Sequence, residues 1–173
     1  FTSGLSVNYI DFDTTPNVLA PTGGTLFYDS VNNALSYKPL TNNNDVTIQI
    51  GQESVVRIYN DSGVQINNGQ ALNITGSTSG ASTVRLAIAS GGNNPYYQVD
   101  GVTTHDIPNG EFGFMSVFGE VRDLNLTAFT NGENIYLSQT VPGSFDHYSN
   151  LSFTGRTIQI GHVVNNSSLG EFC

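Results

Sequence analysis

Positive charge is scarce in this chain of 173 residues. The chain has five Lys and Arg residues against fourteen Asp and Glu, which gives a net charge of −9. A nucleic-acid-binding surface needs several cations on one face to neutralise phosphates, whereas these five lie singly along the chain. We therefore expect neither a nucleic-acid partner nor binding to an anionic membrane. The five cations are Lys38, Arg57, Arg85, Arg122 and Arg156.

Cysteine, tryptophan and long apolar runs are also sparse. The single cysteine, Cys173, leaves no intrachain disulfide and no cysteine-rich metal site. No apolar run approaches the roughly 18 residues of a membrane-spanning helix, so we expect no membrane insertion. The sequence starts at Phe1 rather than Met and stops within an expected strand at 171–173. From these ends we expect a piece of something longer.

Helical periodicity is lacking as well. Gly, Pro, Asn or Asp interrupts the chain every few residues, and the runs between them alternate with a period of two. Charged residues make up only 11% of the chain, whereas exposed helices usually carry many Glu, Lys and Arg. These patterns predict an all-β protein, a small β-barrel or sandwich with an N-terminal β-hairpin arm. We place the arm at 1–50 and the barrel or sandwich domain at 51–173.

The arm contains a short alternating run at 9–13 and a hairpin. Strands at 25–28 and 34–37 flank a turn at 29–33, where Asn can adopt the positive φ of a tight turn. A lone hairpin is marginally stable in water, so its apolar face should dock on the next domain or on another copy of the chain. The side chains of that face are Leu26, Tyr28, Leu35 and Tyr37.

The densest apolar run spans 112–124. As one strand it would place Phe112, Phe114 and Phe118 on one face, and Met115, Val117 and Val121 on the other. A strand that is apolar on both faces is expected to be buried on both, at the centre of a sheet or barrel. Gly113 and Gly119 suggest bulges or close backbone approaches within it.

Two aspartates in the arm raise the possibility of a cation site. Asp11 and Asp13 are two residues apart, so both carboxylates would project from one face of a strand. Calcium needs several further oxygen ligands, and the rest of a calcium loop is missing from the sequence around them. The interpretation we favour is a solvated strand edge, and we predict no metal and no cofactor.

Histidine–carboxylate pairs raise the possibility of catalysis. They occur at 105–106 and 146–147, but adjacent strand residues point to opposite faces, so neither pair forms a dyad by spacing. His162 alternates with apolar neighbours and should be half-buried. A glycosidase would need two acids across a cleft, and spacing cannot select a pair among fourteen. We predict no catalytic residues, and keep a glycan-degrading enzyme as a third hypothesis.

Tyr96 and Tyr97 directly follow a flexible segment at 91–95. Exposed tyrosines anchor protein interfaces or stack on sugars. Sugar sites often use Trp, and this chain has none. We predict an interface or core role for the pair, and keep glycan contact as the alternative.

An ordered series of short motifs carries a family resemblance. It consists of Arg-Ile-Tyr-Asn-Asp-Ser-Gly at 57–63, Asn-Gly-Gln at 68–70, and runs at 101–113, 117–124, 128–138 and 158–164, with a lead-in at 46–53. The series covers most of 24–164. It resembles a β-domain common in structural proteins of tailed bacteriophages, such as tail fibre proteins, and is similar more loosely to small head-decoration domains. Such domains usually continue through a further apolar strand, whereas this sequence stops at Cys173.

The resemblance implies a non-enzymatic, trimeric component of the virion. We therefore predict a subunit of a surface appendage, either a tail or head fibre or a capsid decoration, that acts by assembly and adhesion. Its expected partners are further copies of the chain and other capsid or tail proteins. The alternative function is that of a carbohydrate-binding module of an adhesin, with a host surface glycan as its partner.

Overall fold

The computed structural model describes residues 7–12, 14, 21–40, 46–91 and 95–173. Within these ranges the chain forms thirteen β-strands and two short 3₁₀ helices, with no α-helix. The prediction of an all-β fold is confirmed. The chain divides into two compact units, Phe1–Gln52 and Glu53–Cys173, where the sequence suggested a boundary between 50 and 51. Each unit is described by itself.

The first unit contains the hairpin that the sequence predicts. β1 (Thr25–Asp29) and β2 (Ala34–Lys38) pair antiparallel, with Leu26 opposite Tyr37. β3 (Ile48–Gln49) pairs with the other edge of β2 and completes a three-stranded sheet in the order β1-β2-β3. The Asp29 carboxylate braces the turn, since its Oδ1 accepts a hydrogen bond from the backbone N of Val31 at 2.9 Å.

One expectation for this unit needs correction. Residues 9–12 form no strand, and Asp13, the second half of the possible cation site, lies outside the described residues. In the hairpin, Leu26 is 45% and Tyr37 38% exposed, while Ala34 and Ser36 on the opposite face are buried. Alternation identifies the two faces of a hairpin but not which one packs inward. Docking of the apolar face on another surface stays a prediction.

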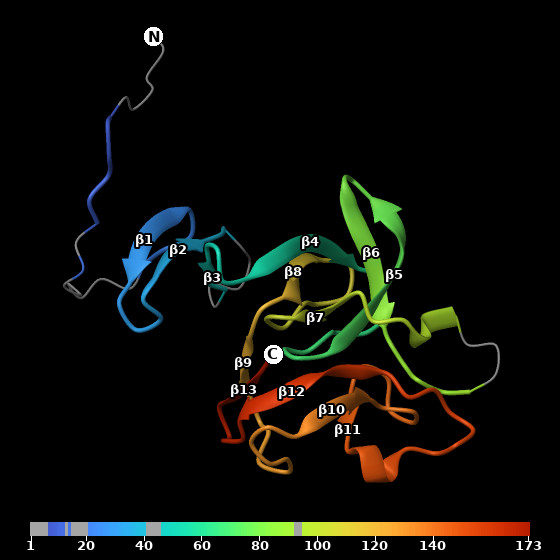
Figure 1. The fold of residues 1–173 in the computed structure, drawn as a ribbon. Helices are drawn as coiled ribbons and strands as arrows, with labels where there is room; N and C mark the ends of the chain where they lie inside the picture. Colours follow the sequence, from blue (N-terminus) through green and yellow to red (C-terminus); the bar gives the residue numbers. More distant parts are fainter. Residues whose placement is uncertain (1–6, 13, 15–20, 41–45, 92–94) are drawn as a thin grey trace. The chain divides into compact units, whose positions relative to one another are not determined.

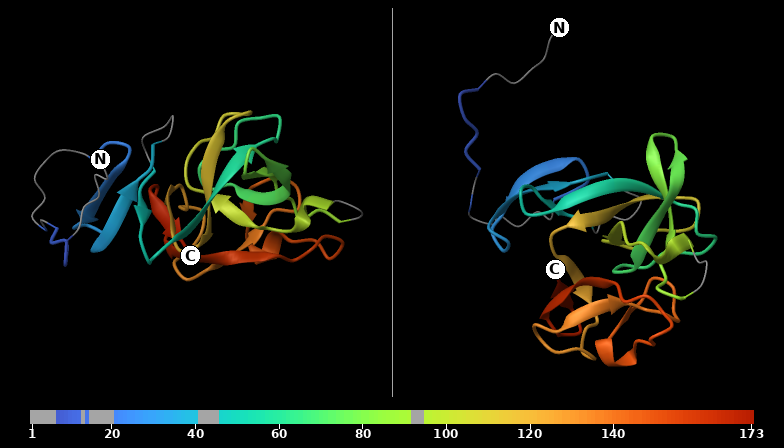
Figure 2. Two further views of the ribbon diagram at one scale, coloured as in Figure 1. Left: turned by 90° about the horizontal axis from the view of Figure 1, so that it is seen from above. Right: turned by 45° about the vertical axis from the view of Figure 1, so that its right-hand side comes forward.

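The second unit begins with a closed five-stranded barrel (Figure 1), in which the strands follow one another around the circumference in the order β4-β6-β5-β7-β8. β4 runs parallel to β6 and antiparallel to β8. The hairpin of β5 and β6 rises beyond the other barrel strands in both Figure 1 and the right-hand view of Figure 2. The barrel strands are β4 (Ser54–Asn60), β5 (Ala71–Thr78), β6 (Ala81–Leu86), β7 (Gly101–Thr103) and β8 (Phe112–Phe118).

The interior of the barrel is filled by aliphatic side chains. They come from alternate positions of the strands and from the segments that connect them, as the pleat of a strand requires. Each of these residues is at most 1% exposed. They are Ile58, Ile66, Leu72, Val84, Ile107 and Met115.

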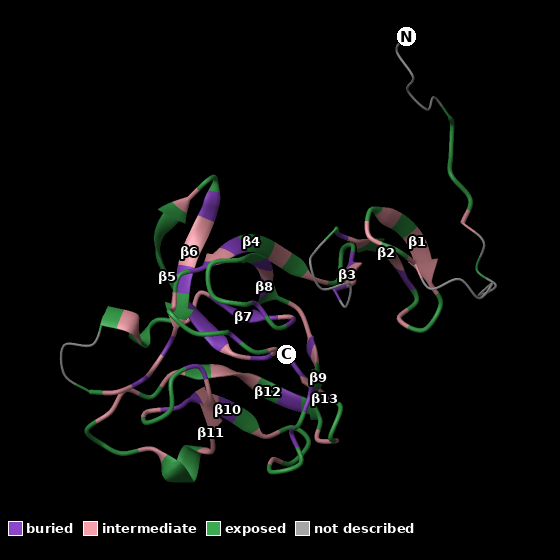
Figure 3. Ribbon diagram, turned by 180° about the vertical axis from the view of Figure 1, so that it is seen from behind, coloured by how far each residue is buried: buried purple, intermediate pink, exposed green. Residues whose placement is uncertain are grey.

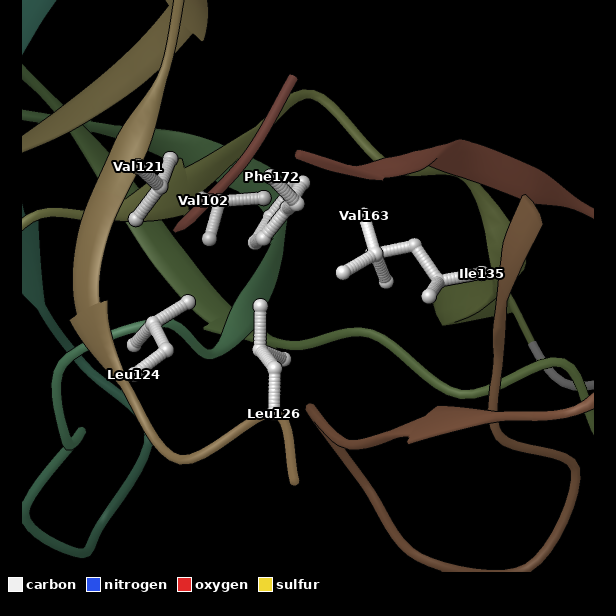
Figure 4. Close-up of a cluster of buried hydrophobic side chains, with 7 residues drawn as sticks. All are labelled: Val102, Val121, Leu124, Leu126, Ile135, Val163 and Phe172. Carbon is white, nitrogen blue, oxygen red and sulfur yellow. The ribbon is translucent and has the colours of Figure 1, made fainter. Parts of the chain in front are cut away.

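A second sheet packs below the barrel in Figure 1, in the order β11-β10-β12-β13-β9. A buried apolar cluster lies between the two layers, and Figure 4 shows Val102 of the barrel beside Phe172 of the sheet. Buried residues concentrate in these layers, whereas η2 and the outer part of β5 are exposed (Figure 3). The new elements are η1 (Pro95–Tyr97), β9 (Val121–Leu124), β10 (Asn134–Leu137), β11 (Phe145–Asp146), η2 (Tyr148–Asn150), β12 (Gln159–Asn165) and β13 (Gly170–Phe172).

The expectation of one strand at 112–124, buried on both faces, is wrong. The chain forms β8 in the barrel, turns at Gly119, and continues as β9 in the second sheet. Met115 is buried, but Val117 is 46% and Phe118 70% exposed. A run that is apolar on both faces can pass from one layer to another, and its side chains near the crossing then face the space between the layers.

Candidate functional site

A groove runs between the barrel and the second sheet. One wall comes from β7 and β8, the other from β12 and β13, and the open groove has a volume of about 600 Å³. Its surface is mainly aliphatic and aromatic, with contributions from Val102, Val121, Ile160 and Phe172. Three of these four residues, Val102, Val121 and Phe172, belong to the buried cluster of Figure 4, so the floor of the groove is continuous with the core.

Two glycines give the groove its shape. Gly119, where the chain leaves the barrel, has a φ of 111°, a conformation open mainly to glycine. Gly101 on β7 lies so close to β8 that a Cβ there would stand 2.7 Å from the backbone oxygen of Ser116. A side chain at either position would disturb the wall formed by these two strands.

A bulge at the end of β8 presents two apolar side chains to the groove. Ser54 of β4 pairs with Phe118 and Val55 with Ser116, so Val117 is left between them. The Ser116 hydroxyl donates a hydrogen bond to the backbone oxygen of Phe118 at 3.0 Å and holds this irregular segment. Val117 and Phe118 both line the groove while remaining largely exposed.

The structure separates the two tyrosines that the sequence singles out. Tyr97 lines the groove and is 41% exposed, with the guanidinium carbon of Arg156 4.1 Å from its ring centroid. Tyr96 is not among the lining residues, and its backbone oxygen instead accepts a hydrogen bond from the N of Ile88 at 2.9 Å. Phe118, rather than Tyr96, is the second exposed aromatic side chain that lines the groove. The sequence feature that could have pointed to Phe118 is Gly119, which directly follows it and marks an interruption of the strand.

One charged side chain lies among the described residues that line the groove, that of Asp100. Its Oδ2 accepts hydrogen bonds from the Ile74 backbone at 2.7 Å and the Asn73 amide at 3.2 Å, and its Oδ1 accepts one from Gln98 at 3.3 Å. The carboxylate is thus satisfied within the chain. The groove offers apolar packing surface with little net charge.

Arg122 ties the start of the barrel to the second sheet. Its Nη1 lies 2.6 Å from Glu53 before β4, its Nη2 2.6 Å from Glu120 in the β8–β9 turn, and its Nε 3.5 Å from Glu171 on β13. Partial burial works to lower the pKa of Arg122, but the hydrogen bond to Glu53 and the attraction of the three carboxylates outweigh it and raise that pKa. The arginine therefore stays charged and offsets part of a local excess of negative charge.

Each histidine of the two histidine–carboxylate sequence pairs contacts a residue other than the aspartate next to it. His105 is buried, with its Nδ1 3.2 Å from the Thr104 hydroxyl, while Asp106 accepts a hydrogen bond from the backbone N of Asn68. His147 instead lies 2.5 Å from Glu133, and the ring of Phe129 stacks on it at 4.4 Å. The Nδ1–Oε1 contact with Glu133 joins residues fourteen positions apart, so adjacent spacing could not predict it.

The Glu133 carboxylate is well bound. Its second oxygen accepts hydrogen bonds from the backbone N and the hydroxyl of Thr130, at 3.0 and 3.1 Å. The hydrogen bond with His147, followed by that from the Thr130 backbone, lowers the pKa of Glu133.

The expectation for His162 is wrong, because this side chain is exposed and its neighbour Val163 is buried. A register shift between Gln159 and Gly161, opposite Tyr136 and Ile135 of β10, interrupts the alternation on which that expectation rested.

Within the ranges that the structure describes, no group of three or more His, Cys, Asp or Glu side chains could hold a metal ion. No helix in that same part of the chain is long and apolar enough to cross a membrane. Searches with the chain gave no match to a protein-family model, to a curated protein or to a solved structure.

Proposed function

We propose that the chain is a structural subunit of a tailed-bacteriophage virion, part of a trimeric surface appendage such as a fibre or a capsid decoration. It acts by packing against copies of itself and against other virion proteins, without catalysis. The observation that carries this proposal is the groove itself. It combines an apolar floor, exposed aromatic side chains at Tyr97 and Phe118, and, among the described lining residues, one acidic side chain, Asp100, that is already satisfied. Such a surface suits association by apolar burial.

The motifs behind the resemblance support the proposal by their positions. The run at 101–113 comprises β7, the turn after it and the start of β8, and the run at 117–124 comprises the crossing into β9. Together they supply Gly101, Val102, Val117, Phe118 and Gly119 to the groove. Two of the runs in the series that resembles phage structural domains thus contribute to this surface.

The proposal is tested on purified particles of the phage that encodes the chain. Quantitative mass spectrometry should find the chain in intact particles at a fixed copy number that is a multiple of three, and cross-links should join it to capsid or tail proteins. A chain that is produced during infection but washes away from intact particles would contradict the proposal.

One observation favours the alternative, a carbohydrate-binding module. Tyr97 presents an exposed aromatic ring in a groove that Gln98 and Gln159 also line, and rings beside amide groups can hold sugars. A glycan array decides between the two functions. Selective binding that is lost in Tyr97→Ala but kept in Tyr96→Ala, whose side chain is not in the groove, would favour the module.

A further inference from the structure

Within the ranges that the structure describes, Arg57 differs from the other arginines in having no ion-pair or side-chain hydrogen-bond partner. Arg85 forms an ion pair with an aspartate, and Arg122 contacts three glutamates. Arg156 donates a hydrogen bond to the backbone oxygen of Ser90 at 2.9 Å. Arg57 is exposed on β4. In a chain with fourteen acidic and five basic residues, a cation that no acid pairs with is unexpected.

An aromatic ring holds the guanidinium of Arg57 in place. Its central carbon lies over the ring of Phe112, 3.8 Å from the centroid. Tyr59 packs edge-on against the same ring, with centroids 5.1 Å apart and an interplanar angle of 62°. Contact with a ring uses the flat face of a guanidinium and leaves the N–H groups at its rim open to an acceptor. Arg57 is therefore preorganised as a fork of hydrogen-bond donors.

The register of β4 and β8, which are neighbours in Figure 1, gathers these side chains on the outer surface of the barrel. Tyr59 pairs with Phe112 and Arg57 with Phe114, and directly opposite residues of an antiparallel pair share a face. Ile58 between them points into the barrel interior, so the four flanking side chains point outward. Phe112 is 36% exposed, and Tyr59 and Phe114 are half-buried. We call these four residues the Arg57 patch.

The patch has a second donor without a partner. The Tyr59 hydroxyl makes no hydrogen bond to any described residue, and its ring packs on Phe112 from the neighbouring position. The patch thus combines two uncommitted donors, a guanidinium and a phenol, with partly exposed aromatic surface. That combination binds a carboxylate attached to an apolar face.

The size of the patch suits a single ligand ring. Neighbouring strands lie about 4.8 Å apart, and two residues along a strand span about 7 Å. A stable protein interface buries about 800 Å² on each partner, which is far more than four side chains on two strands offer. A six-membered sugar ring is of comparable width, and its C–H face packs on aromatic side chains.

Charge selects an acidic sugar over a neutral one. A guanidinium fork matches a carboxylate in geometry and charge. The net charge of −9 repels an extended polyanion, but exposed charges more than about 8 Å apart are largely screened at physiological ionic strength. A ligand with one isolated carboxylate is therefore attracted to Arg57 without meeting the repulsion of the whole chain.

From the unpartnered, ring-held Arg57 and its aromatic neighbours, we propose that this face of the barrel binds an acidic sugar, a uronic or sialic acid. The carboxylate accepts hydrogen bonds from the Arg57 guanidinium and the Tyr59 hydroxyl, and the sugar ring lies against the aromatic side chains. The four patch residues are not among those that line the groove. The site therefore adds a ligand to the proposed structural role and does not depend on it.

Titration of the full chain with matched sugars, followed by NMR, tests the site. The acidic probes are methyl glucuronide, methyl galacturonide and the methyl glycoside of N-acetylneuraminic acid. Each is paired with the neutral sugar in which the carboxylate is reduced to an alcohol. At least one acidic probe should shift the backbone amide signals of β4 and β8, and its neutral counterpart should bind at least about tenfold more weakly.

Three variants make the test specific. Arg57→Gln should weaken binding of the acidic probe at least about tenfold. Arg57→Lys keeps the charge but lacks the fork, so it should recover only part of the affinity. Arg85→Gln removes a cation that is 44% exposed outside the patch and should leave binding unchanged. Amide signals far from β4 and β8 should be the same in both Arg57 variants, which shows that the fold is intact.

The inference is overturned if acidic and neutral sugars bind equally, if no acidic probe binds at millimolar concentrations, or if binding survives Arg57→Gln. A glutamate-containing peptide that binds as tightly as the acidic sugars would assign the patch to an acidic protein partner, which also overturns it. The proposed function is judged separately, by the copy number of the chain in particles. Either one can therefore fail while the other stands.

Discussion

Replacing Arg122 by Met should destabilise the second unit substantially. The substitution keeps an apolar stem of similar length but removes the guanidinium that contacts Glu53, Glu120 and Glu171. The side chain of Glu53 is only 8% exposed, so it cannot be rehydrated in place. The variant therefore takes the guanidinium away from a buried carboxylate and leaves three like charges close together.

The size of the effect follows from burial. Removing one partner of a fully buried ion pair destabilises by about 3–5 kcal/mol. Arg122 is 28% and Glu120 38% exposed, so water screens part of the cluster. We expect a loss of about 2–3 kcal/mol in the free energy of unfolding. For a chain of this size the melting temperature should fall by roughly 4–12 °C.

Arg85→Met is the matched control. Arg85 lies 3.8 Å from Asp61, and both side chains are largely exposed, at 44% and 57%. Its removal should change stability by less than about 0.5 kcal/mol. Urea unfolding of the two variants, with Glu53→Gln added to Arg122→Met, gives the comparison. The double variant should recover part of the loss, because it removes the buried negative charge of Glu53. If Arg122→Met is no more damaging than Arg85→Met, the reasoning about burial is refuted.

Three further predictions concern single positions. His147 and Thr130 lower the pKa of Glu133, so this carboxylate contributes stability above its unfolded pKa, and the contribution is lost as pH falls through its folded pKa, below 4.5. The difference in melting temperature between wild type and Glu133→Gln should therefore shrink steadily from about pH 6 to about pH 3. A difference that stays constant over this range would contradict the assignment. Gly119→Ala forces a side chain onto a φ of 111° and should reduce the free energy of unfolding by about 1–3 kcal/mol. Gly76→Ala should change the free energy of unfolding much less, because φ is not positive there and the nearest atom is the Thr83 hydroxyl at 3.1 Å. Met115→Ala, in the barrel interior at 1% exposure, should reduce the free energy of unfolding by about 2–5 kcal/mol. Val117→Ala, two positions along the same strand but 46% exposed, should reduce it by under about 1 kcal/mol in the dissociated chain.

Local patterns in the sequence were enough for the fold class and for the first hairpin. The turn at 29–33 is specified by residues next to one another, because the Asp29 side chain binds the backbone of its own turn. The alternating runs predicted strands such as β4 and β6 because their signal is also local. Period-two alternation is a property of each strand and needs no knowledge of its neighbours.

The layers and the groove depend on contacts that are distant in sequence. Nothing local in 112–124 says that the chain changes sheets at Gly119, since a continuous buried strand shows the same apolar density. The Arg122 cluster joins residues from 53 to 171, and His147 pairs with Glu133, fourteen positions earlier in the sequence. Tyr97 could be named as a candidate beforehand, whereas Phe118 was assigned to a buried face.

The claim that the chain functions as a self-assembling structural subunit is tested most directly by its absolute molar mass in solution. Light scattering on the purified chain, over a range of micromolar concentrations, should converge on three times the chain mass of 18.5 kDa. A mass that stays at one copy across that range would contradict the claim.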